Sequence, residues 1–177
     1  MGSLITYRVN GFFDHMLNNI RKRSAPTATT LKMLDDIGWK ILAALQADAR
    51  IPFAELGRRI GLSTPAVTER VHRLEEAGII LRYRAELDHA KVGYPILAFV
   101  RVNVVGDFLQ RIMKVSRELP EVLECHRVTG DDSFIIKVAV GSVDELQKLI
   151  DGLTPFVATT TSVVLSEVVT HRAIQPR

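Results

Sequence analysis

A chain of 177 residues with 47% hydrophobic residues is long enough to bury one core or to divide into two small domains. No apolar run approaches the ~20 residues that span a bilayer, and the N-terminal segment lacks the apolar centre of a secretory signal. We therefore expect a soluble cytoplasmic protein with no membrane partner. The single cysteine, Cys125, excludes an intrachain disulfide framework and is expected to be buried.

The net charge of +3 is unevenly distributed along the chain. Residues 1–34 carry five basic and one acidic side chain, residues 35–86 carry eight of each, and residues 87–177 carry ten basic and eleven acidic ones. Any basic surface in the middle segment must therefore come from the placement of its arginines and not from an excess of positive charge.

The first 34 residues show no sustained periodicity, and they include the segment RKRSAPTATT, which is basic and then small and polar. This composition predicts a flexible N-terminal arm over residues 1–34. Two interpretations stay open: a leader outside the fold, or a basic arm that contacts DNA phosphates.

Three helices are predicted next along the chain. The first follows Asp35 or Asp36, either of which can cap it. Its apolar residues recur at helical spacing, at Ile37, Ile41, Ala44 and Leu45. The second helix is expected to carry Pro52 in its first turn, with Leu56 and Ile60 facing inward.

The third helix is predicted to begin after a turn at Gly61, with Ser63 as its N-cap, and to end at Gly78. At about 100° per residue, a narrow inward stripe is formed by Val67, Val71 and Leu74. The opposite side is small and polar in its N-terminal half, which lets another large surface approach. Two such helices joined through a glycine turn predict a helix-turn-helix that binds the major groove of DNA. A helical hairpin with an ordinary solvated face is the alternative.

The segment ILRYRAEL, residues 80–87, alternates in a way that predicts a strand. Arg82 and Arg84 fall on one side of it, and Leu81 and Tyr83 on the other. Directly after a recognition helix, such a strand is expected to form a wing. Its two arginines either reach phosphate oxygens or belong to a solvated strand face.

The predicted DNA-binding domain covers residues 35–86, a hinge covers residues 87–94, and a second domain covers residues 95–177. Within the second domain, DFLQRIM at residues 107–113 and DELQKLI at residues 144–150 share one pattern, 37 residues apart. Each lies between two alternating apolar runs, which predicts β-α-β twice over. Two such units form an antiparallel sheet with both helices on one side, the ferredoxin-like βαββαβ sandwich of the α+β class.

The predicted strands are the runs ILAFVRVNV, LECHRV, FIIKVAV and TTTSVVLSEVV. Apolar residues occupy both faces of the first and third, because Leu97, Phe99 and Ile135 point away from the helix-covered side. The same sheet of a second copy is the simplest cover, so we expect a homodimer interface there. Such a dimer would set two recognition helices about one turn of DNA apart and predicts a pseudo-palindromic binding site.

The sequence offers no coherent catalytic or metal-binding pattern. Its five histidines form no i, i+4 pair and no CxxC occurs, so we expect no metal site. Cys125 and His126 are neighbours on a predicted strand and point to opposite faces. No phosphate-binding glycine motif is present. We therefore expect neither enzyme activity nor a cofactor.

The loop TGDDSF joins the second and third predicted strands. A simple hairpin is one interpretation, since Gly-Asp turns are favoured there. A ligand site is the other: Asp131 and Asp132, with the hydroxyls of Thr129 and Ser133, could receive the ammonium group of a small zwitterion while loop N–H groups meet its carboxylate.

Two long stretches resemble the Lrp/AsnC, or feast/famine, family of prokaryotic transcription regulators. The first is LDDIGWKILAALQADARIPFAELGRRIGLSTPAVTERVHRLEEAGIILRYRAEL, and the second is VLECHRVTGDDSFIIKV. The resemblance covers about residue 35 to the end and rests on the ordered pattern S-x-x-x-V-x-x-R-V-x-R-L-E-x-x-G-x-I together with the V-T-G-D loop. It implies a dimer that associates further, often to octamers, binds double-stranded DNA near promoters and takes small effectors, typically amino acids.

By this resemblance, the recognition helix comprises Ser63, Thr64, Pro65, Thr68, Glu69, Arg70, His72 and Arg73. The effector loop comprises Thr129, Gly130, Asp131, Asp132 and Ser133, where the family commonly has an aromatic residue and an aspartate in place of the last two. We expect Thr68, Glu69 and His72 to contact the edges of DNA bases, and contacts to DNA phosphates to supply most of the affinity. The lead hypothesis is thus a sequence-specific, nucleoid-bound regulator tuned by an amino acid. An architectural protein that wraps DNA with little sequence choice is the alternative.

Overall fold

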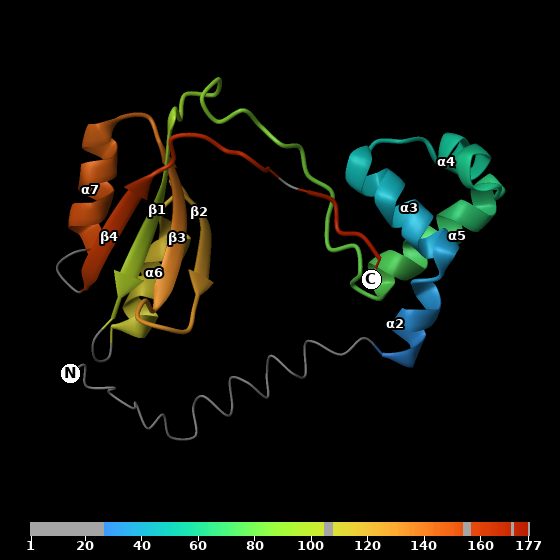
Figure 1. The fold of residues 1–177 in the computed structure, drawn as a ribbon, viewed down its shortest axis with the longest axis horizontal. Coiled ribbons are helices and arrows are strands. Elements are labelled where there is room, and N and C mark those ends of the chain that lie inside the picture. The colour runs from blue at the N-terminus through green and yellow to red at the C-terminus, as the bar shows by residue number, and fades with distance from the viewer. Residues whose placement is uncertain (1–26, 105–107, 154–156, 171, 177) are drawn as a thin grey trace, which may run out of the picture. The chain divides into compact units, whose positions relative to one another are not determined.

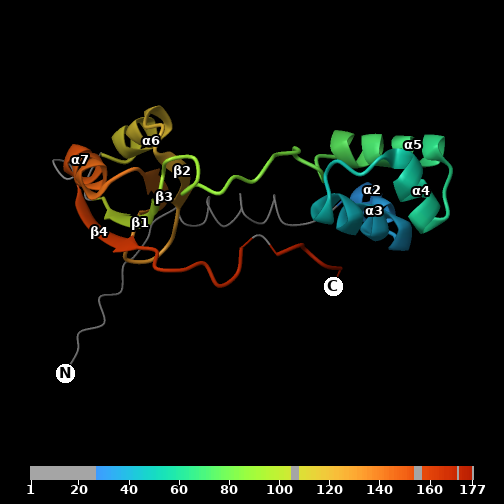
Figure 2. The ribbon, with the colours of Figure 1, turned by 90° about the horizontal axis from the view of Figure 1, so that it is seen from above.

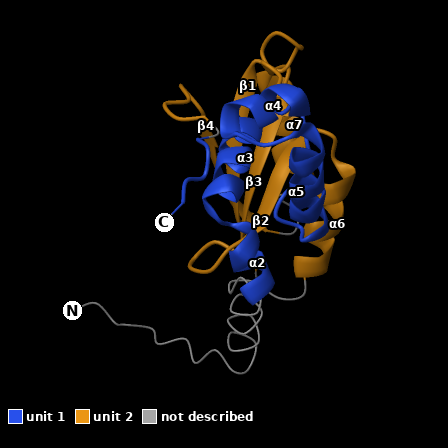
Figure 3. Cartoon of the chain, turned by 90° about the vertical axis from the view of Figure 1, so that its right-hand side faces the viewer, with its two compact units in different colours: residues 1–84, 172–177 blue, residues 85–171 orange. Residues whose placement is uncertain are grey.

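The computed structural model describes residues 27–104, 108–153, 157–170 and 172–176. The chain divides into two compact units, which Figure 3 shows in different colours. We call residues up to Arg84 together with residues 172–177 the helical unit, and residues 85–171 the sheet unit. The C-terminal residues therefore group with the helical unit, although the sequence predicts them in the second domain.

The helical unit contains α2 (Ala28–Met33), α3 (Asp36–Ala47), α4 (Phe53–Ile60) and α5 (Thr64–Glu76), as Figure 1 shows. The three helices predicted from the periodicity are confirmed as α3, α4 and α5. The helix α2 is a difference, because it forms within the predicted arm, and Met33 and Leu34 pack against the core. Residues 1–26 of that arm lie outside the described residues.

Apolar residues at helical spacing build the core of this unit. Its buried members are Ile41, Leu42, Leu45, Ile51, Leu56, Val67, Val71 and Leu74. The predicted stripe of α5 is therefore confirmed. The unit's turn between α4 and α5 depends on Gly61, whose φ of +76° is the left-handed conformation that glycine adopts without strain.

The helix starts agree with the prediction in part. Asp35 caps α3, because its Oδ1 accepts a hydrogen bond from the backbone N–H of Gly38 at 2.7 Å. Pro52 lies at the N-cap of α4, one position before its first turn. Ser63 occupies the N-cap of α5, but its side chain makes no capping hydrogen bond.

The strand predicted over residues 80–87 is wrong, and no wing forms from it. No strand lies between α5 and β1 in the part of the chain that the structure describes. A strand needs a neighbour for its backbone groups, and the sheet offers none to this segment. Leu81 is 80% exposed and Tyr83 is exposed as well, so the alternation buries neither side.

The sheet unit follows the order β1 (Ile96–Asn103), α6 (Leu109–Glu118), β2 (Val122–Arg127), β3 (Phe134–Val140), α7 (Val143–Leu153) and β4 (Ala158–Val163). The strands lie in the order β2-β3-β1-β4, and each neighbouring pair is antiparallel. Both helices pack on the same side of the sheet (Figure 2). The ferredoxin-like prediction is confirmed.

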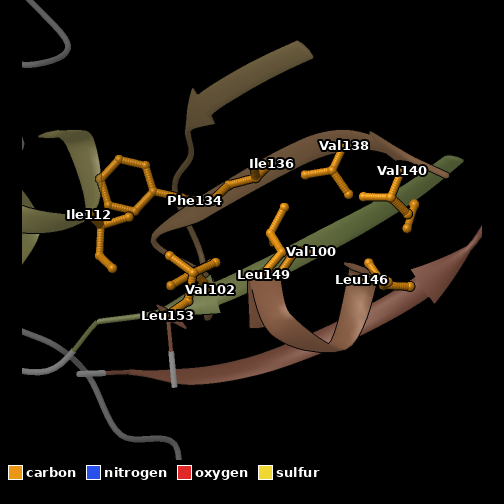
Figure 4. Close-up of a cluster of buried hydrophobic side chains, with 11 residues drawn as sticks. Val100, Val102, Ile112, Phe134, Ile136, Val138, Val140, Leu146, Leu149 and Leu153 are labelled. Atoms are coloured by element: carbon orange, nitrogen blue, oxygen red, sulfur yellow. The ribbon is translucent and has the colours of Figure 1, made fainter. Parts of the chain in front are cut away.

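The core of the sheet unit lies between the strands and these two helices (Figure 4). Alternate residues of β1 and β3 meet Ile112 of α6 and Leu146, Leu149 and Leu153 of α7. Helix α7 begins with two capping hydrogen bonds that resemble a capping box: Ser142 Oγ accepts from the N–H of Glu145 at 3.2 Å, and the Glu145 carboxylate accepts from the N–H of Gly141, one residue before Ser142, at 2.8 Å.

The fourth strand is shorter than predicted. The N–H of Val164 still donates to the carbonyl of Leu97 at 2.8 Å, but the next hydrogen-bonding position on that side is Pro95, which has no N–H to donate. The strand therefore ends at Val163, and the rest of the apolar run TTTSVVLSEVV leaves the sheet. Asp107 of the predicted repeat lies outside the described residues.

The side of the sheet away from the helices differs from the prediction at one residue. Leu97 is only 4% exposed in a single chain, so it needs no second copy to cover it. Phe99 is 39% exposed and Ile135 is half-buried. Cys125 on the edge strand β2 is exposed and not buried. We call the side that carries Phe99 and Ile135 the open face of the sheet.

Candidate DNA-binding helix and effector loop

The exposed side of α5 lies opposite the stripe that packs into the helical core. At about 100° per residue, Pro65, Glu69 and His72 project from that side, and all three are exposed. We call these three residues the outer face of α5. It is the surface at which the sequence predicts contact with DNA.

Charges on this helix are paired with one another. The Glu69 carboxylate accepts from Nε of Arg73 at 2.8 Å and lies 2.7 Å from Nη2 of the same guanidinium. Exposed ion pairs of this kind contribute only ~0–1 kcal/mol, so this one opens readily when a base or phosphate takes either partner. His72 Nδ1 lies 3.9 Å from the carboxylate of Glu75, too far for a hydrogen bond to hold the ring.

The start of α5 carries small exposed residues, Ser63, Thr64 and Pro65. Because the Ser63 hydroxyl makes no capping bond, it is available to a partner outside the helix. The Thr68 hydroxyl instead donates to the carbonyl of Thr64 at 3.0 Å. Thr68 therefore presents its methyl group and an acceptor oxygen, with its donor already used inside the helix.

Arg70 lies on the flank of α5 that faces α3. Its Nη1 donates to both carboxylate oxygens of Asp35, at 2.9 and 3.0 Å. This hydrogen bond first, and the one from the Gly38 N–H second, hold the pKa of Asp35 below its ordinary value of 3.8. The DNA contact predicted for Arg70 thus competes with a bond that positions the recognition helix.

Arg82 and Arg84 follow α5, and both are exposed. Tyr83 between them donates its hydroxyl to the Glu75 carboxylate at 2.9 Å. Partial burial of the Tyr83 ring, first, and this hydrogen bond, second, raise the pKa of Tyr83 to about 12. The two arginines are therefore tethered to the end of α5 by Tyr83, although no strand forms.

Two arginines that the sequence analysis did not single out lie in the last turn of α4. Arg58 and Arg59 both donate to the carboxylate of Glu55, at 2.8 to 2.9 Å. These bonds, from Arg58 first, lower the pKa of Glu55 to about 2. The first helix of a helix-turn-helix crosses the DNA backbone. The adjacent arginine pair in α4 was therefore a signal in the sequence from which candidate phosphate contacts could have been named.

The loop Thr129–Ser133 joins β2 to β3, and tertiary contacts hold two of its residues. The N–H of Ser133 donates to the carbonyl of Val102 at 2.8 Å, and its Oγ accepts from the N–H of Val104 at 3.1 Å. Asp132 lies 3.7 Å from the guanidinium of Arg101 on β1. Sequence reasoning missed Arg101, because nothing in the order of residues links it to the loop.

The other loop residues are open to solvent. Thr129, Gly130 and Asp131 are exposed, and Gly130 has a φ of +115°, which a residue with a Cβ rarely adopts. The structure thus brings together the Asp131 carboxylate, for which no ion pair with another described residue is found, and a loose pair of opposite charges at Arg101 and Asp132. That combination suits a small molecule that carries both charges.

Within the described ranges, no three His, Cys, Asp or Glu side chains gather as metal ligands, and no helix is long and apolar enough to cross a bilayer.

A helix-turn-helix unit followed by a ferredoxin-like sheet unit defines a class of two-domain regulators that bind DNA and a ligand. Residues 34–75 match the AsnC-type helix-turn-helix domain, and residues 97–174 match the Lrp/AsnC ligand binding domain. The chain belongs to the Lrp/AsnC family of transcriptional regulators, as the resemblance in the sequence implies. It is a transcriptional regulator with a DNA-binding and a ligand-binding domain.

Relatives and solved structures extend this match over most of the chain. The HTH-type transcriptional regulator LrpC of Bacillus subtilis is 36% identical over 76% of this chain and 94% of its own length. Its structure covers 78% of this chain and 99% of that chain at a TM-score of 0.74. A Neisseria meningitidis transcriptional regulator in complex with L-Met is 29% identical, with a TM-score of 0.75 over 80% of this chain and 96% of that chain.

Proposed function

We propose that this regulator reads specific DNA sequences with the outer face of α5 and that an amino acid bound at loop Thr129–Ser133 tunes its DNA binding or assembly. One observation carries the first half: α5 buries a narrow apolar stripe and leaves Pro65, Glu69 and His72 exposed. The second half rests on the arrangement of charges around Asp131.

The proposed reading of DNA divides the side chains by chemistry. Glu69 accepts from the exocyclic amine of cytosine, His72 bonds to a base edge, and the Thr68 methyl group meets a thymine methyl group. Short side chains at Ser63, Thr64 and Pro65 let the helix backbone approach the groove.

Arginines supply the proposed contacts to phosphate. Arg73, Arg82 and Arg84 donate to phosphate oxygens, and Arg70 does so when it leaves Asp35.

For the effector, we propose a zwitterionic amino acid whose carboxylate meets Arg101 and whose ammonium group meets Asp131 and Asp132. The separation of 3.7 Å between Arg101 and Asp132 exceeds the ~2.7–2.9 Å of a tight charge-assisted hydrogen bond, so the pair is open to insertion. The L-Met complex of the Neisseria meningitidis relative supports an amino acid as the ligand class.

We further propose that the chain works as a homodimer through the open face of the sheet, and that dimers associate further, to octamers. Phe99 on that face and the segments outside the sheet expose apolar side chains, among them Leu81, Leu87, Leu165, Val168 and Val169. A lone chain would leave these in water, whereas a second copy would cover them. The assembly would act in the cytoplasm, on the nucleoid.

Mapping the genomic DNA that the purified protein retains, with and without single amino acids, tests this function. We expect enrichment of fragments that share a pseudo-palindromic site, and a change in enrichment with at least one amino acid. Uniform retention of all fragments would replace sequence reading with architectural wrapping. Retention that no amino acid alters would remove the effector role.

A further inference from the structure

A groove of about 280 Å³ lies among α2, α3 and α5 of the helical unit. Its lining includes Thr29, Lys32 and Met33 of α2, Gly38 of α3, and Arg70 and Arg73 of α5. Three of these side chains are cations, and none of the described lining residues carries a carboxylate. The groove therefore favours an anion.

Carboxylates outside the lining neutralise two of the three cations. Arg70 is bound to Asp35 and Arg73 to Glu69. Lys32 makes no ion pair with any residue that the structure describes and is exposed. Among the described residues, Lys32 is thus the cation of the groove without an ion pair, and it lies beside Arg73, whose exposed ion pair exchanges at little cost.

The contacts at the two ends of α2 determine the position of Lys32. Thr27 caps α2 by accepting from the N–H of Thr30 at 3.1 Å. At its other end, the carbonyl of Met33 lies directly against Gly38, where a Cβ would collide with it. Together these contacts hold α2 on α3 and beside α5 (Figure 1).

The groove adjoins the outer face of α5. Arg73 follows Glu69 by four residues and is turned only about 40° from it around the helix. With the outer face in the major groove of DNA, that flank of α5 meets the sugar-phosphate backbone at the edge of the groove. A phosphodiester oxygen is therefore the anion nearest to Lys32 and Arg73.

We propose that Lys32 and Arg73 clasp a phosphate of the DNA backbone in this groove, so that α2 adds an anchor beside the recognition helix. This inference rests on the proposed function. It concerns residues of α2, because Thr29, Lys32 and Met33 precede the AsnC-type helix-turn-helix match at residues 34–75.

Salt dependence of binding tests the clasp. The full-length wild type is compared with Lys32→Gln and Lys32→Arg, by fluorescence anisotropy on one retained duplex and on a scrambled duplex over a range of KCl. We expect Lys32→Gln to weaken binding to both duplexes equally and to reduce the slope of log K against log salt by about 0.9 per bound chain. Lys32→Arg, which keeps the cation, should restore the slope.

Lys40→Gln is the matched control, because Lys40 is exposed on α3 and does not line the groove. A Lys32→Gln slope equal to that of wild type, or equal to that of Lys40→Gln, would overturn the clasp while the proposed function stands. Failure of the wild type to bind any duplex would overturn both. Calorimetry with inorganic phosphate adds a last arm: tight, Lys32-dependent binding of free phosphate would make this a small-anion site instead.

Discussion

The outer face of α5 and the loop Thr129–Ser133 hold their functional side chains in different ways. On α5, the periodicity that buries one stripe also determines which residues are exposed, and the exposed pair Glu69–Arg73 is itself local. In the loop, Asp132 and Ser133 are engaged by Arg101 and Val104 of another segment. Which side chains of a helix face are available for binding is thus determined by nearby residues in the chain. In a loop, it depends on contacts with distant segments.

The largest expected effect tests whether the helical unit, which carries α5, and the sheet unit, which carries the loop, each depend on their own core. Leu56 is fully buried in the helical unit, so Leu56→Ala should destabilise that unit by ~2–5 kcal/mol. Trp39, the single tryptophan, packs against the same core and reports its unfolding by fluorescence in urea. The matched variant Ile136→Ala removes a buried residue of the sheet unit. An equal shift of the Trp39 transition in both variants would show one shared cooperative unit.

A second prediction concerns the open face of the sheet. If the proposed dimer forms through this face, Phe99→Asp should convert it to monomers in analytical ultracentrifugation, because an unpaired carboxylate in an apolar interface is costly to desolvate. Val143→Asp introduces the same side chain at an exposed apolar position on α7 and should leave the dimer intact. A Phe99→Asp protein that still sediments as a dimer would place the interface elsewhere.

The loop is tested by calorimetry against a panel of amino acids. For the amino acid that binds wild type, Asp131→Ala and Arg101→Gln should each lower the affinity roughly tenfold or more, since each removes a charged hydrogen-bonding partner. Asp144→Ala, an equal change of charge on α7, serves as the control. Unchanged heats in Asp131→Ala and Arg101→Gln would separate the effector from this loop.

The smallest expected effect concerns the bond that positions α5. The pKa of Asp35 is lowered in the folded chain, so its contribution to stability is present above pH 3.8 and is lost as the pH falls through the lowered value. Asp35→Asn keeps a capping side chain but removes the charge paired with Arg70. We expect the free energy of unfolding, followed by Trp39 fluorescence, to depend less on pH in this variant between about pH 5 and pH 2, the range that spans the unfolded value of 3.8 and the lowered folded value. An identical pH dependence would show that the pair contributes nothing.

The same contrast between local and tertiary features explains what could be predicted. The three helices, the ferredoxin-like order and the stripe of α5 follow from spacing, so the sequence was sufficient for them. The strand over residues 80–87 was predicted wrongly because alternation alone cannot supply a neighbouring strand. The helix α2 was missed because its segment lacks apolar periodicity and its packing against α5 is tertiary.

The residues of the candidate sites also fall into those that local spacing predicts and those that tertiary packing determines. Glu69 and His72 could be assigned to an exposed face from helix geometry. Nothing in the sequence showed that Arg70 would be bound to Asp35, or that Arg101 would lie beside Asp132. Those pairs join residues far apart in the chain, and only the packing of the fold brings them together.

The most direct measurement of the central claim compares the affinity of the protein for a retained duplex and for a scrambled one, in wild type, Glu69→Ala and His72→Ala. If the outer face of α5 reads bases, each variant should lose about 1–3 kcal/mol of discrimination while its affinity for scrambled DNA changes little. An undiminished preference for the retained duplex in both variants would contradict that claim.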